Sequence, residues 1–289
     1  MIETQHQGVS SWLRENSAFL MYQPIVEVEK DPETGRDRIH SLALEALLRS
    51  VPSGATSSAP ADFLSRLDTE SRLGLFDWVL GSTMNDLSSL HGDVFRKDQV
   101  ERCPLRYVSV NVEADAIMAP GFKAVLRERL QKAPAWFQPR QLVLEFLESI
   151  PSIEVLDRVS TIREELRKSG IQLAIDDFGE HFNGFAQIRS LMPDILKIGG
   201  TYSRAVESGH RHDIAYSQAA IHMCHSLDMD CVAEGVETDV QYNILRKLGV
   251  KKFQGFLLGK AMRIEEIDAW LQKIWTSHPQ ESLEAMILS

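Results

Sequence analysis

Residues 171–179 read IQLAIDDFG, an apolar run of strand length that ends in the acidic pair Asp176 and Asp177. A lone carboxylate costs free energy to bury unless it is paired or coordinates a metal ion. Further short apolar runs carry a carboxylate or amide in the same way, at Glu45 in LALEALLR, Asn111 in YVSVNVE, Glu145 in QLVLEFLE and Glu234 in CVAEGVE. The repetition predicts one site to which several strands contribute oxygen ligands, and such ligands suit hard divalent cations.

Strand-like runs alternate with helical patterns along the 289 residues of the chain. The predicted strands, eight in number, cover residues 22–28, 42–49, 107–113, 141–148, 171–178, 194–199, 230–237 and 251–258. Helical patterns lie at residues 61–90, which can hold two helices, and at 155–169, 215–227, 240–248 and 264–274. The alternation predicts an α/β protein with a TIM-like (β/α)8 barrel, whose active site lies at the carboxyl ends of the strands.

The connection between the first two predicted strands is unusual. Residues 29–40, EKDPETGRDRIH, contain proline and glycine and show no helical period. A parallel pair needs a longer crossover, so this connection predicts a hairpin and an antiparallel first strand. The predicted domain organisation is a helical lead-in over residues 1–20, a barrel over residues 21–276 and a tail over residues 277–289.

Composition and charge limit the class of protein. The three cysteines lack regular spacing, which argues against a disulfide framework. The net charge of −10 disfavours nucleic acid as a partner, so we expect no DNA binding. No apolar run reaches membrane-spanning length and no leader pattern is present, which predicts a cytoplasmic protein without a membrane segment. If the strand-end acids hold cations, a ligand that carries phosphate remains compatible with the negative charge.

The strand-end residues predict a site for a pair of divalent cations. Glu45, Asn111, Glu145 and Asp176 could hold one cation, and Asp177 and Glu234 could hold the second, with Asp176 bridging. Two such ions activate water for in-line displacement at phosphorus. Lys197 could orient the water, Arg49 could clamp a phosphate, and Gln254 could contact water or ligand. Taken singly, each Glu could instead form a structural ion pair, Asp176–Asp177 could be a helix cap with its neighbour, and Lys197 could extend its amine to solvent.

Eight motifs from about Met21 to Ile274 carry a family resemblance. They are, in order, YQPIVEV, EALLR, SVNVE, LVLEFLES, AIDDFG, DILKIG, AEGVET and QGFLLGK. Together they resemble an EAL-domain cyclic di-GMP phosphodiesterase. The resemblance implies a barrel with an antiparallel first strand. It also implies hydrolysis of one phosphodiester of cyclic di-GMP to linear pGpG with two Mg²⁺ or Mn²⁺ ions.

The resemblance also assigns roles to residues. The implied metal ligands are Glu45, Asn111, Glu145, Asp176, Asp177 and Glu234. Lys197 would act on the catalytic water together with Glu234, with Gln254 and Glu237 assisting. Arg49 would contact substrate phosphate, Gln23 and Leu47 would line the substrate, and Glu148 would anchor the loop after the fifth strand. Such domains often form homodimers, which the resemblance implies here as well.

The chain departs from the family pattern at several positions. The family's DDFGTGYSSL reads DDFGEHFNGF here, which places Glu180 in the loop, and its KID reads KIG, which places Gly199 where a carboxylate is usual. Glu113 and Ala261 are further departures. An alternative is therefore a catalytically impaired EAL-like domain that binds cyclic di-GMP or a protein partner as a signalling receptor. A metal-using barrel enzyme of another class, such as an aldolase or an enolase-like lyase, is the third hypothesis, and the motif order speaks against it.

Overall fold

The computed structural model describes residues 2–33, 35–51, 60–90, 105–147, 153–180 and 184–276. Its strands are β1 (Phe19–Lys30), β2 (Asp37–Arg49), β3 (Leu105–Asn111), β4 (Leu142–Leu147), β5 (Gln172–Phe178), β6 (Ile195–Ile198), β7 (Asp230–Ala233) and β8 (Lys252–Gln254). Its α-helices are α1 (Ile2–Glu15), α2 (Ala61–Leu64), α3 (Thr69–Ser89), α4 (Ala114–Met118), α5 (Phe122–Gln131), α6 (Ile153–Lys168), α7 (Gly184–Leu191), α8 (Gly200–Ala205), α9 (Arg211–Ser226), α10 (Asp239–Lys247) and α11 (Ile264–Thr276). Short 3-10 turns, η2 (Pro139–Gln141) and η3 (Val206–Ser208), precede β4 and follow α8.

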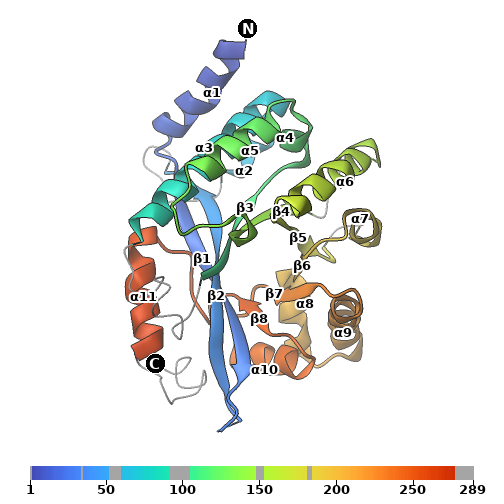
Figure 1. The fold of residues 1–289 in the computed structure, drawn as a ribbon. Helices are drawn as coiled ribbons and strands as arrows, with labels where there is room; N and C mark the ends of the chain where they lie inside the picture. The colour runs from blue at the N-terminus through green and yellow to red at the C-terminus, as the bar shows by residue number, and fades with distance from the viewer. Residues whose placement is uncertain are drawn as a thin grey trace.

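The strands close into a barrel in chain order, β1 to β8, with the helices around it (Figure 1). Strand β1 pairs antiparallel with both β2 and β8, and every other neighbouring pair is parallel. The β1–β2 hairpin pairs from Phe19 opposite Arg49 to Lys30 opposite Asp37, with a shift of register between Glu27 and Val28. The predicted α/β barrel with an antiparallel first strand is thus confirmed.

Strands β7 and β8 are shorter than the sequence predicts. Gly235 ends the extended run after β7, because its φ of +61° lies in the left-handed region. Beyond β8, a Cβ on Gly255 would lie 2.1 Å from the carbonyl oxygen of Val236, so the two chain segments touch backbone to backbone. The amide of Val236 donates to the carbonyl of Gln254 at 3.0 Å. The apolar runs therefore continue beyond the strands as crossing loop segments that border the barrel mouth.

The barrel interior is layered. One layer is apolar and takes one buried residue from each of β1 to β7, namely Ile25, Ala43, Tyr107, Val143, Ala174, Ile195 and Val232. Side chains on a strand alternate between its two faces, so a step of two residues returns to the interior. That step along the parallel strands leads to a polar layer of Glu45, Ser109, Glu145, Asp176, Lys197 and Glu234. The apolar layer thus lies directly beneath the polar residues and forms the floor of the site.

The helices cover the outside of the barrel and bury its outer face. Of the helices in the described residues, α3 is the longest, with 21 residues, and the carboxylate of Asp68 accepts from the amide of Ser71 at its start. Its buried face includes Leu80 and Leu87. Among the described residues, no helix combines the length and apolar character needed to cross a membrane.

A buried hydrogen bond connects the first strand to α3. The Tyr22 hydroxyl, on a fully buried side chain, donates to Asp86 at 2.7 Å. Tyr22→Phe leaves the Asp86 carboxylate without this donor, and we expect it to lower the free energy of unfolding by about 1–2 kcal/mol. Urea denaturation followed by circular dichroism measures the change. The matched control is Tyr216→Phe, at a side chain 62% exposed, which should stay within about 0.5 kcal/mol. Equal effects at the two tyrosines would contradict this account.

Candidate functional site

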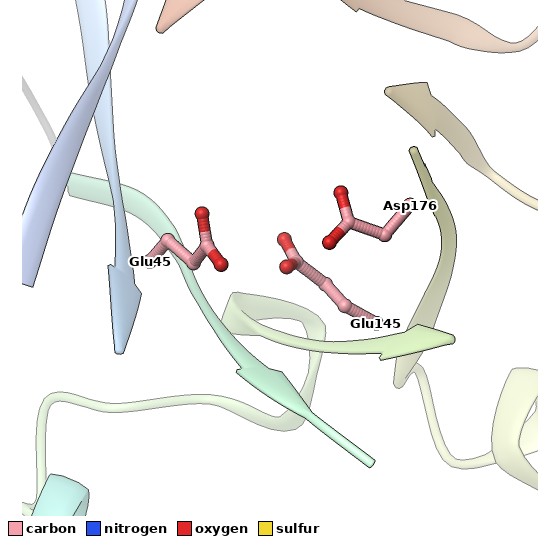
Figure 2. Close-up of side chains that lie close together, drawn as sticks. All are labelled: Glu45, Glu145 and Asp176. Carbon is pink, nitrogen blue, oxygen red and sulfur yellow. The ribbon is translucent and has the colours of Figure 1, made fainter. Parts of the chain in front are cut away.

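Three carboxylates from three strands meet at the carboxyl end of the barrel. Glu45 on β2, Glu145 on β4 and Asp176 on β5 turn their carboxylate groups toward a common space (Figure 2). All three are buried, and one oxygen from each lies within 4.8 Å of the others. Asp176, Asp177 and Glu234 form a second group that meets the same distance. Asp176 belongs to both groups, so the structure brings together most of the predicted cation ligands.

Lys197 on β6 projects into the middle of these carboxylates. Its side chain is 1% exposed, and its Nζ lies 3.2 Å from Glu45, 3.0 Å from Glu145, 2.9 Å from Asp176 and 2.8 Å from Glu234. Burial by itself would lower the pKa of Lys197, but the surrounding carboxylates, with Asp176 and Glu145 foremost, raise it well above its ordinary value. Lys197 is therefore a fixed ammonium group.

One ammonium does not balance the charge around it. Burial, opposed by Lys197 and reinforced by Glu45 and Asp176, raises the pKa of Glu145 to about 8. Burial likewise raises the pKa of Glu234 well above its ordinary value. For Glu45 burial acts in the same direction, yet Lys197 and the hydrogen bonds from Gln254 and Asn111 bring its pKa below the ordinary value. The site has a surplus of acidic groups, which a bound cation would offset.

The hydrogen bonds around Glu45 orient it toward the centre of the site. Asn111 on β3 donates through Nδ2 to Glu45 at 3.1 Å, and Gln254 on β8 donates through Nε2 at 2.6 Å. One buried acceptor atom, Oε1 of Gln254, has no hydrogen-bond partner, and Oδ1 of Asp176 meets only the Lys197 ammonium at 2.9 Å. An unsatisfied buried oxygen beside an all-oxygen donor set fits hard divalent cations such as Mg²⁺ or Mn²⁺.

Asp177 differs from Asp176 in backbone and exposure. Its φ of 53° lies in the left-handed region, which aspartate tolerates better than most residues. Asp177 is the penultimate residue of β5, and its side chain is part-buried at the edge of the site. Burial, followed by the charges of Asp176 and Glu180, raises the pKa of Asp177 to about 6.

A cleft opens from these carboxylates to solvent. Its lining consists of Gln23, Glu45, Asp177, Glu180, Gly200, Arg204, Glu234, Gly235, Glu237, Gln254, Gly255 and Phe256. Besides the predicted cation ligands Glu45, Asp177 and Glu234, three further residues predicted from the motifs lie in this lining, namely Gln23, Glu237 and Gln254. Gln23 stands opposite Glu45 in the β1–β2 hairpin and donates to the carbonyl of Gly259 at 3.3 Å, while the amide of Glu237 donates to Gln241 at 2.8 Å.

Other predicted residues lie beside the cleft. Arg49 and Leu47 are near the end of β2, outside the cleft lining, and Arg49 donates to the carbonyl of its neighbour Leu48 at 2.9 Å. Burial lowers the pKa of Arg49, and Glu45 opposes this shift. Glu148 lies outside the described residues, so its predicted role as loop anchor stays a prediction.

Sequence reasoning did not identify Glu180, Arg204 and Phe256 as cleft residues. Phe256 is 60% exposed, and Lys260 Nζ lies 5.4 Å from the centre of its ring. The Arg204 guanidinium covers Gly200, where a Cβ would lie 2.6 Å from Nη1. The adjacent glycines 199 and 200 were the one sequence signal for these residues. Because glycine has no side chain, it leaves room for long side chains from other segments.

The raised pKa of Asp177 predicts how stability changes with pH in metal-free protein. Because folding raises this pKa from 3.8 to about 6, the stabilisation present below pH about 4 is lost as the pH rises through about 6. In EDTA at pH 7.5 (roughly 1.5 units above that pKa), we expect Asp177→Asn to be more stable than the wild type by about 1–2 kcal/mol, with allowance for solvent screening. The difference should shrink toward pH 4 in urea denaturation. Exposed Asp157 on α6 provides the control, and Asp157→Asn should show no such trend.

Comparisons with known proteins agree with this geometry. The family model described as the EAL domain matches residues 6–261. The chain is 30% identical over 263 residues to the cyclic di-GMP phosphodiesterase NbdA of Pseudomonas aeruginosa, covering 90% of this chain and 31% of that protein. It thus spans less than half the length of curated relatives such as NbdA.

Solved structures show the same fold. The PaMucR phosphodiesterase in complex with c-di-GMP superposes with a TM-score of 0.69 at 26% identity, over 90% of this chain and 99% of that one. The manganese and cyclic di-GMP complex of Klebsiella pneumoniae BlrP1 gives a TM-score of 0.65 at 25% identity, over 85% of this chain and 56% of that one. The family model covers most of the sequence and the barrel carries its acidic residues at the expected end. The chain therefore belongs to the EAL domain family.

Proposed function

We propose that this chain is a metal-dependent phosphodiesterase that hydrolyses one phosphodiester bond of cyclic di-GMP to give linear pGpG. One observation carries the proposal: two groups of close carboxylates, which share Asp176, stand at the bottom of an open cleft. The named activity of relatives such as NbdA supports the choice of substrate.

The donor set suits a pair of cations. Glu45, Asn111, Glu145 and Asp176 would hold one ion, and Asp177 and Glu234, with Asp176 shared, would hold the other. When bound, two divalent cations generate a nucleophilic water at neutral pH and stabilise the oxygens of an in-line displacement at phosphorus. Mg²⁺ and Mn²⁺ both accept such oxygen ligands, and the manganese complex of the related BlrP1 supports the proposal.

The residues of the chain position the other reactants. Because its carboxylate neighbours keep Lys197 protonated, it would donate hydrogen bonds to the attacking water or to phosphate and would not abstract a proton. Gln254 fixes Glu45 through its Nε2 and keeps Oε1 available to a water. Glu237 at the cleft wall would assist, and Gln23 would line the substrate. Arg49 at the end of β2 would contact a phosphate and Leu47 the substrate, after a rotation of their side chains toward the cleft.

A second function has one observation in its favour. The Lys197 ammonium already lies among four carboxylates and offsets part of their charge without a metal ion. In a receptor that binds cyclic di-GMP and does not hydrolyse it, Lys197 would offset the carboxylate charge in this manner. The homodimer and the cytoplasmic location expected from the sequence stay predictions.

Hydrolysis tests the proposed function. We expect purified protein with Mn²⁺ or Mg²⁺ to convert cyclic di-GMP to linear pGpG, separated by chromatography, and EDTA to stop the conversion. Glu45→Ala removes an oxygen ligand together with the group that Asn111 and Gln254 hold, so turnover should fall by more than the roughly 10–100-fold typical of outer partners of a metal site.

The control is Glu164→Ala, which removes a carboxylate whose side chain is 52% exposed on α6 and should leave turnover unchanged. Full turnover in Glu45→Ala would refute this metal site. Nucleotide binding by the wild type without any pGpG would favour the receptor.

A further inference from the structure

Gly199 is not required by its own backbone conformation. Its φ of −55° and ψ of 147° are open to any residue, so a side chain at this position would cause no strain in the main chain. A side chain there would instead require the Glu180 side chain to move. A Cβ on Gly199 would lie 2.7 Å from both Cγ and Oε1 of Glu180, closer than atoms can pack. The glycine therefore provides the room in which the Glu180 side chain lies.

The Glu180 carboxylate has a definite partner in that space. Its Oε1 accepts from the backbone amide of Thr201 at 3.0 Å, which links the loop after β5 to the first turn of α8. Hydrogen bonds from an amide to an ionised carboxylate are stronger than those between neutral groups. Two positions that depart from the EAL pattern therefore lie next to each other, and the Glu180 side chain occupies space that a side chain at residue 199 would need.

The segment held in this way is the turn that carries Asp177. The amide of Glu180 donates to the carbonyl of Asp177 at 3.1 Å and closes the turn, and the amide of Gly199 donates to the carbonyl of Phe178 at 3.3 Å. Between them Gly179, with φ +96°, approaches the Tyr202 ring so closely that a Cβ would lie 2.5 Å from Cε2. The turn thus packs against β6 and α8, and the Glu180 side chain connects it to the Thr201 amide.

We infer that Glu180, seated against Gly199, is a positioning residue that fixes the Asp177 turn for cation binding. It acts through the Thr201 amide and does not itself need to contact the ion. Asp177 has a left-handed backbone and a part-buried carboxylate, so its direction depends on the contacts that hold the turn. The inference rests on the proposed function for its metal readout, although the attachment itself can be measured in metal-free protein.

Two variants of equal charge separate attachment from electrostatics. Glu180→Gln loses the negative charge but keeps an oxygen for the Thr201 amide, whereas Glu180→Ala loses both. If Glu180 positions the turn, Glu180→Ala should weaken Mn²⁺ binding in calorimetry by about 10-fold, in the range for outer partners of metal sites, and Glu180→Gln should lie much nearer the wild type. Equal weakening in the two variants would overturn the inference, because the charge alone would then explain it.

A double-mutant cycle tests the role of Gly199. Gly199→Ala should displace the Glu180 side chain and weaken Mn²⁺ binding to a similar extent as Glu180→Ala. In the Glu180→Ala background the same glycine substitution meets no obstructing side chain, so it should have little further effect. Independent, multiplicative losses in the double variant would show that the two positions are uncoupled and would reject the inference.

Hydrogen exchange gives a readout that needs neither metal nor turnover. In metal-free protein, the Thr201 amide should exchange faster in Glu180→Ala than in the wild type and remain protected in Glu180→Gln. If the wild type binds no Mn²⁺ but this difference is seen, the proposed function fails and the attachment stands. If the Thr201 amide exchanges equally fast in all three proteins, the attachment is refuted whatever the metal binding.

Discussion

The ammonium of Lys197 among four carboxylates is the interaction around which the barrel mouth is organised. Each partner comes from a different strand or strand end, with Nζ to oxygen distances of 2.8–3.2 Å. A buried ion pair is weak evidence for stability, because removing the charges from water costs about as much as their attraction returns. One cation shared by four anions is less favourable still, and burial together with the neighbouring carboxylates raises the pKa values of Glu145 and Glu234.

The apolar layer below makes this arrangement possible. The floor contributed by β1 to β7 excludes water from the lower barrel, and the closed hydrogen-bonded sheet fixes the strands that carry the acids. Burial on such a floor strengthens electrostatic interactions, including those with any ion or phosphate that enters from the cleft. The burial of several carboxylates in one place lowers stability without a cation, and it thus also favours cation binding.

The loop after β5 shows how such a site can tolerate change at single positions. Glu180 lies in space that a side chain at residue 199 would need, and its carboxylate accepts from the Thr201 amide. Arg204 in the same way covers Gly200. Motif comparison registers Gly199 and Glu180 as two separate departures, whereas the structure shows that the Glu180 side chain lies against Gly199.

The sequence alone was sufficient for the order of strands, the antiparallel hairpin and the inward-facing acids. These are local properties: hydrophobic period, the shortness of residues 29–40 and the fixed step of two residues along a strand. Tertiary structure decided what depends on distance between remote segments. The ends of β7 and β8 follow from the contact of Gly255 with Val236, the cleft includes Phe256 and Arg204, and Lys197 meets four acids at once. In the sequence, Glu180 is only a departure from the family pattern in the loop after β5. The tertiary structure places its side chain against Gly199, because no local pattern records which side chain fills the space beside a glycine.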